Sequence, residues 1–306
     1  MMSSNRANRN ELIVVTGAST GIGAATAREL ARKGFHVLAG VRRDADAEAL
    51  RAQNIEPHIL DITMETDVAA IADRVARDPL RRPLRALVNN AGIAVNSPVE
   101  TLPIDQWRRQ FEVNLFGHIA MTQKLLPALL LSGGTVVNIS SVGGKVVLPT
   151  YGSYAGSKFA LEAASDALRR EVAELGIKVV VVEPGAVKTE MAERGISTAE
   201  GLMASLTEAQ LARYGDLIGA VTAQARSFGE EGVSAEHAAK VVAKAATAPR
   251  PRTRYTIGRD AAILLWINRV VSDRGLDRIV RQNLRSFARK SQAREQRSAA
   301  TTSVGL

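Results

Sequence analysis

Two side chains in the stretch YGSYAGSK, residues 151–158, could together transfer a proton. Tyr154 and Lys158 are four residues apart, so in a helix that starts just before the tyrosine they lie on one face, one turn apart. A phenol has a pKa of ~10, so proton exchange near neutral pH requires a fall of roughly 3 units, which a nearby ammonium group favours. Tyr154 is therefore a candidate acid–base residue, although a tyrosine–lysine pair that stood alone would favour a purely structural role.

Tyr151 is the weaker candidate in the same stretch. It is seven residues before Lys158, which corresponds to about 10.5 Å along a continuous helix axis. Pro149 and Gly152 disfavour a continuous helix at this point.

A glycine-rich turn follows the first apolar run of the chain. The run ELIVVT, residues 11–16, leads into GASTGIG, which begins a helical pattern. Glycine permits a sharp turn at Gly17, close approach of a ligand at Gly21 and helix–strand packing at Gly23. The N–H groups at the start of the helix suit a pyrophosphate. Because the spacing differs from G-x-G-x-x-G, the turn alone is a weak signal of dinucleotide binding.

Short apolar runs alternate with segments of helical period along the chain. We expect strands at residues 11–16, 36–41, 57–61, 85–90, 135–140, 178–184 and 254–257, and helices at about 21–33, 45–53, 65–77, 104–131, 153–175 and 235–247. Such apolar strands, without in–out alternation, are typical of a parallel sheet covered by helices on both faces. The pattern predicts a doubly wound α/β fold with a seven-stranded sheet and extra C-terminal helices.

The order of several motifs resembles that of the short-chain dehydrogenase/reductase family. The resemblance covers residues 11–260 and rests on the glycine turn, Asp61 in LDIT, NNAG at 89–92 and PGAVKT at 184–189. It implies a Rossmann fold that binds a nicotinamide dinucleotide. The cofactor contacts that it implies are Gly17, Ser19, Thr20, Gly21, Ile22, Gly23, Asp61, Ile62, Asn90, Ala91, Gly92, Tyr154, Lys158, Pro184, Gly185, Val187 and Thr189.

The resemblance also implies a catalytic group of four residues. The family's serine lies thirteen residues before the tyrosine, which selects Ser141 over Ser140, and its asparagine in the fourth helix corresponds to Asn114 in FEVNLFGH. The resemblance implies that Ser141 hydrogen-bonds the substrate oxygen, and that Lys158 binds the ribose and lowers the pKa of Tyr154. It implies that Asn114 holds water in a proton relay. The hydride belongs to the nicotinamide.

The end of the second expected strand bears on the choice of cofactor. A carboxylate there would bind the ribose 2′-hydroxyl of NAD, whereas an arginine would pair with the 2′-phosphate of NADP. Val41 stands where the family's acid usually lies and Arg42 follows it, so we expect NADP. NAD is the alternative, because Thr20 is not the basic residue of many NADP-dependent relatives and Asp44 lies close by. Arg43 is compatible with a solvated surface charge.

Residues 188–232 are predicted to form a variable lid over the substrate. The segment is rich in large apolar side chains and holds no arginine cluster that would indicate a phosphate or carboxylate substrate. Most of these side chains are expected to pack helix against helix, but a large apolar lid also suits a lipophilic alcohol or ketone. The stretches FHVLAG and SKFALEAASDALRRE resemble most the retinol and hydroxysteroid dehydrogenase branch of the family.

We therefore predict an NAD(P)-dependent oxidoreductase that acts on CH–OH or C=O groups. The alternatives are a nicotinamide-binding regulator without catalysis and a reductase of a small or acyl-carrier-bound ketone. Inactive relatives usually lack the tyrosine or the lysine, and both are present here. The resemblance also implies a homodimer or homotetramer in which the helices at 104–131 and 153–175 pair across subunits.

The positive charge of the chain is concentrated at its C-terminal end. The net charge is +9, and the segment from Arg250 onward, with thirteen basic and four acidic residues, accounts for all of it. Residues 261–290 are predicted to form basic amphipathic helices. A helix of this kind could rest on an anionic membrane surface, but we favour packing on the body beside the substrate cleft. Nucleic acid is not expected, because aromatic side chains are not interleaved with the arginines.

Composition excludes several other classes of site. The chain has no cysteine, which excludes disulfides, thiolate nucleophiles and cysteine–metal sites. His36, His58, His118 and His237 lie far apart in the sequence without metal-ligand spacing, so no metal is expected. No apolar run approaches ~18 residues and none near the N-terminus has the length of a signal-peptide core, so we expect a cytoplasmic protein. Residues 1–10 and 291–306 are expected to be disordered.

Overall fold

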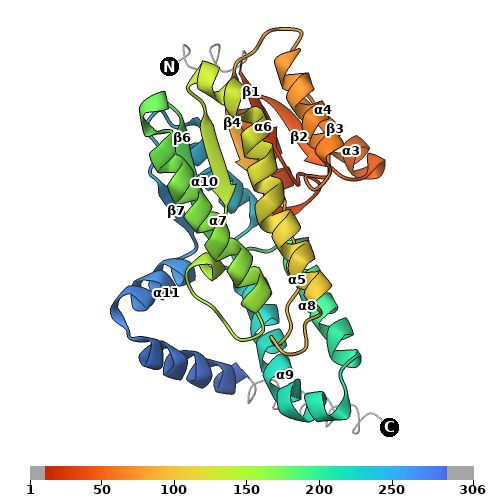
Figure 1. Ribbon diagram of the computed structural model, residues 1–306, viewed down its shortest axis with the longest axis vertical. Coiled ribbons are helices and arrows are strands. Elements are labelled where there is room, and N and C mark those ends of the chain that lie inside the picture. The colour runs from red at the N-terminus through yellow and green to blue at the C-terminus, as the bar shows by residue number, and fades with distance from the viewer. Residues whose placement is uncertain (1–10, 288–306) are drawn as a thin grey trace, which may run out of the picture.

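A seven-stranded parallel sheet with helices on both faces forms the centre of the protein (Figure 1). The computed structural model describes residues 11–287, so the disorder expected at 1–10 and 291–306 lies outside the described residues. The spatial order of the strands is β3-β2-β1-β4-β5-β6-β7. The strands are β1 (Leu12–Val15), β2 (His36–Val41), β3 (Ile55–Ile59), β4 (Leu84–Asn89), β5 (Thr135–Ile139), β6 (Lys178–Pro184) and β7 (Arg254–Ile257). The predicted doubly wound fold is confirmed.

Both faces of the sheet are buried, which explains the continuous apolar runs. Ile13 and Val15 of β1 pack on the side covered by α2 (Gly21–Arg32), α3 (Asp44–Leu50) and α10 (Ala235–Thr247). Leu12 and Val14 point to the opposite side, which is covered by α4 (Glu65–Ala76), α6 (Gly117–Ser132) and α7 (Gly152–Glu171). A strand between two helical layers has no solvent face, so its sequence shows no in–out alternation.

The helix predicted over 104–131 is present as one helical run, Ile104–Ser132, but the π-helical turn within it was not expected. The chain forms α5 (Ile104–Phe111), then a π-helical turn at Glu112–Phe116, and only then α6. A π-helical turn takes in one more residue than an α-helical turn, so it rotates the side chains that follow it. Asn114 lies on this turn and is fully buried.

The edge strand β3 begins and ends two residues earlier than predicted. Its ladder with β2 pairs Val37 with Ile55 at one end and Val41 with Ile59 at the other. The backbone N–H of Asp61 then donates to the Asp67 carboxylate at 2.9 Å, so the chain has left the ladder at that residue.

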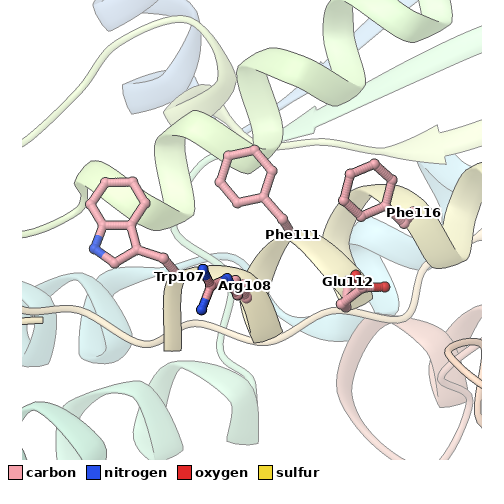
Figure 2. Close-up of a pocket in the computed structure, with 5 residues that line it drawn as sticks. All are labelled: Trp107, Arg108, Phe111, Glu112 and Phe116. Carbon is pink, nitrogen blue, oxygen red and sulfur yellow. The ribbon is translucent and has the colours of Figure 1, made fainter. Parts of the chain in front are cut away.

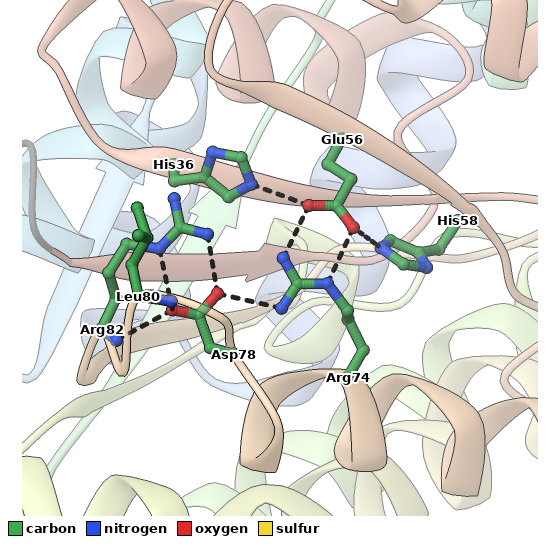
Figure 3. Close-up of polar contacts among 7 residues, drawn as sticks. All are labelled: His36, Glu56, His58, Arg74, Asp78, Leu80 and Arg82. Atoms are coloured by element: carbon green, nitrogen blue, oxygen red, sulfur yellow. Dashed lines mark hydrogen bonds and ion pairs between the residues drawn. The ribbon is translucent and has the colours of Figure 1, made fainter.

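A network of charged side chains ties α4 to this edge of the sheet (Figure 3). The carboxylate of Glu56 accepts two hydrogen bonds from the Arg74 guanidinium, at 2.8 and 2.7 Å, and contacts the Nε2 atoms of His36 and His58, both at 2.9 Å. Arg74 also donates to Asp78 at 2.9 Å. The two histidines, distant in the sequence, therefore flank one carboxylate. The hydrogen bonds from Arg74 lower the pKa of Glu56 to about 2, and burial lowers the pKa of His58.

Further helices lie beyond the carboxyl ends of the strands, in the lower half of Figure 1. They are α8 (Glu190–Ala204), α9 (Glu208–Glu231), α11 (Arg259–Val270) and a helix over residues 273–287. The segment predicted as the lid, 188–232, leaves and rejoins the body at one place, because Val187 and Val233 form a β-bridge. None of the helices within residues 11–287 is long and apolar enough to cross a membrane.

The helix over residues 273–287 packs on the lid helix α9. Leu284 is 6% exposed and lies in one apolar cluster with Ala220 and Val221. The side-chain amide of Gln224 donates to the side-chain oxygen of Asn283 at 2.5 Å. The helix therefore packs its apolar side chains against α9.

Candidate active site

Tyr154 and Lys158 lie on one buried face of α7. The helix begins at Gly152, with Tyr151 as its N-cap, so the tyrosine and the lysine are one turn apart as the spacing predicts. Tyr154 is 9% exposed and Lys158 is 4% exposed. The ammonium nitrogen of Lys158 is 6.0 Å from the centroid of the Tyr154 ring and donates to the carbonyl oxygen of Ile139 at 2.9 Å. The carboxyl end of β5 thus fixes the position of the lysine.

Ser141 lies beside the phenol of Tyr154. It directly follows β5 and Ser140, and its hydroxyl accepts a hydrogen bond from the backbone N–H of Gly143 at 3.0 Å. Gly143 packs against the tyrosine, since a Cβ atom there would lie 3.2 Å from Cε1 of the ring and 3.4 Å from the serine hydroxyl. Burial raises the pKa of Tyr154, and the side chain of Ser141 acts in the opposite direction. Ser140, by contrast, is buried and its hydroxyl has no hydrogen-bond partner among the described residues.

Asn114 connects the π-helical turn to the loop after β4. Its side chain accepts from the backbone N–H of Ile93 at 2.9 Å and donates to the Ile93 carbonyl at 3.0 Å and the Ser157 hydroxyl at 3.1 Å. A Cβ atom on Gly92 would lie 3.4 Å from the Asn114 side-chain oxygen and 3.9 Å from the Lys158 nitrogen. All four predicted catalytic residues therefore meet where β4 and β5 end.

Burial dominates the electrostatics of this group. It raises the pKa of Tyr154, which the hydrogen bond with Ser141 partly opposes. It lowers the pKa of Lys158 to about 8, while the charge of Glu162 acts in the opposite direction. Lys158 thus stays mainly protonated at neutral pH. Burial and the charge of Lys158 also lower the pKa of His118 to about 3, so its ring is neutral, with Nε2 2.6 Å from the Ala91 carbonyl. That the lysine lowers the pKa of the phenol stays a prediction.

A buried cluster of charged side chains continues along α7 from Lys158. Glu162, one turn further along, binds the ammonium of Lys145 at 2.9 Å and the guanidinium of Arg254 at 2.9 Å. Arg254 also lies 3.3 Å from the carboxylate of Glu183. The cluster joins α7 to β6 and β7 directly behind the predicted catalytic lysine.

Hydrogen bonds connect the glycine turn between β1 and α2 to the NNAG stretch. The side-chain amide of Asn90 donates to the carbonyl oxygens of Thr16 and Gly17 at 2.9 and 3.0 Å. The Thr16 hydroxyl in turn accepts from the backbone N–H groups of Asn90 and Ala91. Gly17 has φ +63°, and a Cβ atom there would lie 2.7 Å from Cα of Ala91. A Cβ atom on Gly23 would lie 2.2 Å from the Gly17 carbonyl oxygen, so the turn leaves no room for side chains.

The other predicted cofactor residues near the glycine turn differ in how far they are buried. Ser19 and Thr20 lie at the rim of the turn, and Thr20 is the N-cap of α2 without a side-chain hydrogen bond to the helix. Gly21 faces Thr189 of the PGAVKT stretch, whose Cγ2 would be 3.1 Å from an added Cβ. Ile62 and Val187 are 5% and 8% exposed, so chiefly their backbone atoms could reach a dinucleotide. Ile22 packs against the core.

The predicted cofactor residues after β2 and β3 differ in the polar contacts that they form. Asp61, after β3, accepts from the N–H and hydroxyl of Thr63 at 3.0 and 2.7 Å. Arg42, after β2, is exposed and forms no ion pair or side-chain hydrogen bond within residues 11–287. Its neighbour Arg43 is held by Asp46 through two contacts of 2.8 Å.

Pro184 and Gly185 lie where β6 ends, and a residue that the sequence did not identify supports this turn. The Gly185 N–H donates to the Ile257 carbonyl at 2.8 Å. The Asp260 carboxylate accepts from the N–H of Ala186 at 3.3 Å. Asp260 comes from the start of α11, far along the chain, so no local spacing could have indicated it.

A second missed contact joins α5 to the start of α7. Gln110 is completely buried; its side chain exchanges hydrogen bonds with the backbone of Val95 at 2.9 and 3.0 Å and donates to the Ser153 hydroxyl at 2.5 Å. Ser153 directly precedes Tyr154, so this contact holds the first turn of α7 in place. A single glutamine in a helical pattern carries no signal of such a role.

A family model and several curated proteins match this chain over most of its length. The family model described as short chain dehydrogenase matches residues 11–199. The NADPH-dependent 3-dehydrocapnine reductase of Ornithobacterium rhinotracheale is 32% identical over 286 residues, which cover 91% of this chain and 99% of that protein. Retinol dehydrogenase 5 of Mus musculus is 38% identical over 264 residues, which cover 83% of this chain and 82% of that protein.

Solved structures show the same fold. A short-chain dehydrogenase from Streptomyces avermitilis superposes with a TM-score of 0.69 at 28% identity, covering 92% of this chain and 97% of that one. A short chain dehydrogenase from Burkholderia cenocepacia in complex with NADP gives a TM-score of 0.68 at 25% identity, covering 90% and 98%. The chain therefore belongs to the short-chain dehydrogenase/reductase family, near its retinol dehydrogenase branch, and is an NAD(P)-dependent oxidoreductase.

Proposed function

We propose that the protein transfers a hydride between NADP(H) and a lipophilic secondary alcohol or ketone, or a retinoid-like substrate, with Tyr154 as the general acid–base. The observation that carries this proposal is that the Ser141 hydroxyl and the Lys158 ammonium both lie near the Tyr154 side chain, at the carboxyl end of β5. In open parallel sheets that edge is where ligands bind.

The chain's own residues account for the movement of protons. In the reductive direction Tyr154 donates its proton to the carbonyl oxygen, while the Ser141 hydroxyl hydrogen-bonds the same oxygen and orients it. The nearby Lys158 ammonium stabilises the phenolate that remains. Asn114, held by Ile93 and close to the lysine, is placed to bind the water through which the site is reprotonated. A bound nicotinamide supplies the hydride and, when oxidised, a positive charge.

The glycine turn and the strand ends fit a dinucleotide. Gly17 and Gly23 leave no room for a side chain, so backbone N–H groups at the start of α2 can approach a pyrophosphate. Arg42, which is exposed and forms no ion pair or side-chain hydrogen bond within residues 11–287, is available for a 2′-phosphate, whereas Arg43 is engaged by Asp46. The names of two relatives, an NADPH-dependent reductase and a structure in complex with NADP, support the same preference.

An apolar wall beside Tyr154 supports a lipophilic substrate. The Tyr151 and Tyr154 rings meet edge to face with centroids 6.2 Å apart. Tyr151 also packs against an apolar cluster between the lid helix α9 and the C-terminal helix, formed by Leu217, Ala220, Val221, Val280 and Leu284. The name of retinol dehydrogenase 5 is consistent with a substrate of this kind.

An exposed apolar face on α5, the π-helical turn and α7 supports the proposed homodimer or homotetramer. Figure 2 shows the rings of Trp107, Phe111 and Phe116, which line a pocket on this face. Phe116 is 51% exposed, and Phe159 on α7 is 41% exposed. A second subunit would cover these rings, so we expect sedimentation velocity to show an oligomer that Phe116→Asp dissociates; a monomeric wild-type protein would contradict this.

The test of the proposed function measures the absorbance of reduced nicotinamide with a panel of steroid, retinoid, fatty and small ketones. We expect Tyr154→Phe to lower turnover by about 10²–10⁴-fold, which is the contribution of general acid–base catalysis, and to leave cofactor binding unchanged. Tyr151→Phe is the matched control and should retain turnover. Full turnover in Tyr154→Phe would refute the assignment. Cofactor binding by a wild-type protein without turnover on the whole panel would favour a regulator.

A further inference from the structure

The helix α11 carries an exposed apolar stripe. Ile263, Trp266 and Val270 are 60%, 65% and 61% exposed. Their spacing of three and four residues places them on one face of the helix. The opposite face is attached to the body, where Ala261 is buried and the side-chain amide of Asn268 donates to the Lys145 carbonyl at 3.1 Å. The orientation of the stripe is therefore fixed by packing on the other side of the helix.

Unpaired arginines lie on α11 and on the segment that follows it. Residues 259–287 contain six arginines and three aspartates. All six arginines are exposed, and none forms an ion pair or side-chain hydrogen bond with another residue in the part of the chain that the structure describes. They are Arg259, Arg269, Arg274, Arg278, Arg281 and Arg285. An exposed apolar stripe with unpaired cations beside it is a typical signature of an interaction surface.

Either a second copy of the chain or a lipid surface could cover this face, and the positive charge of the face favours the lipid surface. A second copy of the chain related by a two-fold axis would bring two positively charged faces together, which costs free energy. An anionic lipid surface instead attracts the arginines and accepts the aliphatic side chains below its headgroups. Tryptophan is enriched at that boundary, because its ring is apolar and its N–H is polar.

We propose that α11 rests on an anionic lipid surface through Ile263, Trp266 and Val270, with the flanking arginines at the headgroups. The amphipathic helix over 273–287 does not supply this contact, because Leu284 and Val280 pack toward α9. The hydrogen bond between Asn283 and Gln224 also attaches that helix to α9. The proposal does not depend on the substrate.

The test uses the full chain and vesicles of phosphatidylcholine, alone or mixed with phosphatidylglycerol. The chain has two tryptophans, so in a Trp107→Phe background Trp266 alone reports the contact by fluorescence. We expect a blue shift and co-flotation with the anionic vesicles, and loss of both at high salt. Arg269→Gln and Arg274→Gln should each weaken binding by about fivefold. Ile263→Ser with Val270→Ser should weaken it at least about tenfold.

Leu131→Ser is the matched control, because Leu131 is 92% exposed at the end of α6, away from α11. It should leave vesicle binding unchanged. Absence of binding to anionic vesicles, or binding that the Ile263→Ser, Val270→Ser variant retains, would overturn the proposal. Dissociation of an oligomer by that double variant in sedimentation velocity would assign the face to a second copy and would also overturn it.

Discussion

The ammonium nitrogen of Lys158 lies 6.0 Å from the centroid of the Tyr154 ring, and both side chains are almost completely buried. Burial raises the pKa of Tyr154, which opposes acid–base chemistry near neutral pH, so a positive charge close by is required for the proposed role. At this separation and an effective dielectric constant of about 20, Coulomb's law gives about 3 kcal/mol, or about 2 pH units.

Replacement of Lys158 by methionine should therefore shift the pH dependence of alcohol oxidation. Without the ammonium the phenolate loses its stabilisation, so the ascending limb of kcat/KM against pH should move upward by about 2 pH units. Lys240→Met is the matched control, since Lys240 is exposed on α10, and it should leave the profile unchanged. A lysine that acts only on cofactor binding would change KM for the cofactor and leave the profile in place.

Arg42→Ala should lower the preference for NADP. A hydrogen bond between charged groups contributes about 1.5–3 kcal/mol, so KM for NADPH should rise by about tenfold or more while KM for NADH changes little. Arg43→Ala is the control, because Asp46 already holds that side chain. If Arg42→Ala raised KM equally for NADPH and NADH, this arginine would not bind the 2′-phosphate.

The sequence was sufficient to predict the helices and strands that are marked by the spacing of neighbouring residues. Helical spacing distinguished Tyr154 from Tyr151, and apolar runs located all seven strands, with β3 displaced by two residues. The π-helical turn around Asn114 was missed because its residues fit the helical pattern of the segment on either side of it. Neither the contact between Gln110 and Ser153 nor the packing of the C-terminal helix on α9 could be derived from residue patterns, because the partners are distant in the sequence.

Glu100 links the lid to the body and should influence substrate binding. Its carboxylate accepts from the Tyr214 hydroxyl at 2.7 Å and from the Arg213 guanidinium, both on α9. Because these groups are exposed, Glu100→Gln should raise KM for the substrate by about two- to fivefold and leave cofactor affinity unchanged. Glu200→Gln is the control, since its pair with Arg226 joins α8 to α9 within the lid. An unchanged KM in Glu100→Gln would show that the lid is held without this contact.

Glu56 should make the protein sensitive to acid. Its pKa in the folded state is about 2, below its ordinary value of 4.5, because Arg74 stabilises the carboxylate. A lowered carboxyl pKa contributes stability that is present above pH 4.5 and is lost as the pH falls toward 2. His58 acts in the same direction at higher pH, because burial lowers its pKa below the ordinary 6.5 and protonation therefore favours the unfolded chain. The stability should thus begin to fall below pH 6.5 and fall further below 4.5.

Urea unfolding at a series of pH values measures this dependence. Glu56→Gln should lower the free energy of unfolding at pH 7 by about 1 kcal/mol, a modest amount because the carboxylate keeps partial access to water. The difference from the wild-type protein should shrink below pH 4.5 and be mostly lost near pH 2, where the wild-type carboxyl is itself about half protonated. Glu48→Gln removes only the exposed contact with Arg51 and should change little at any pH. A Glu56→Gln deficit that stayed constant down to pH 2 would show that the loss comes from packing, because charge could not then be its cause.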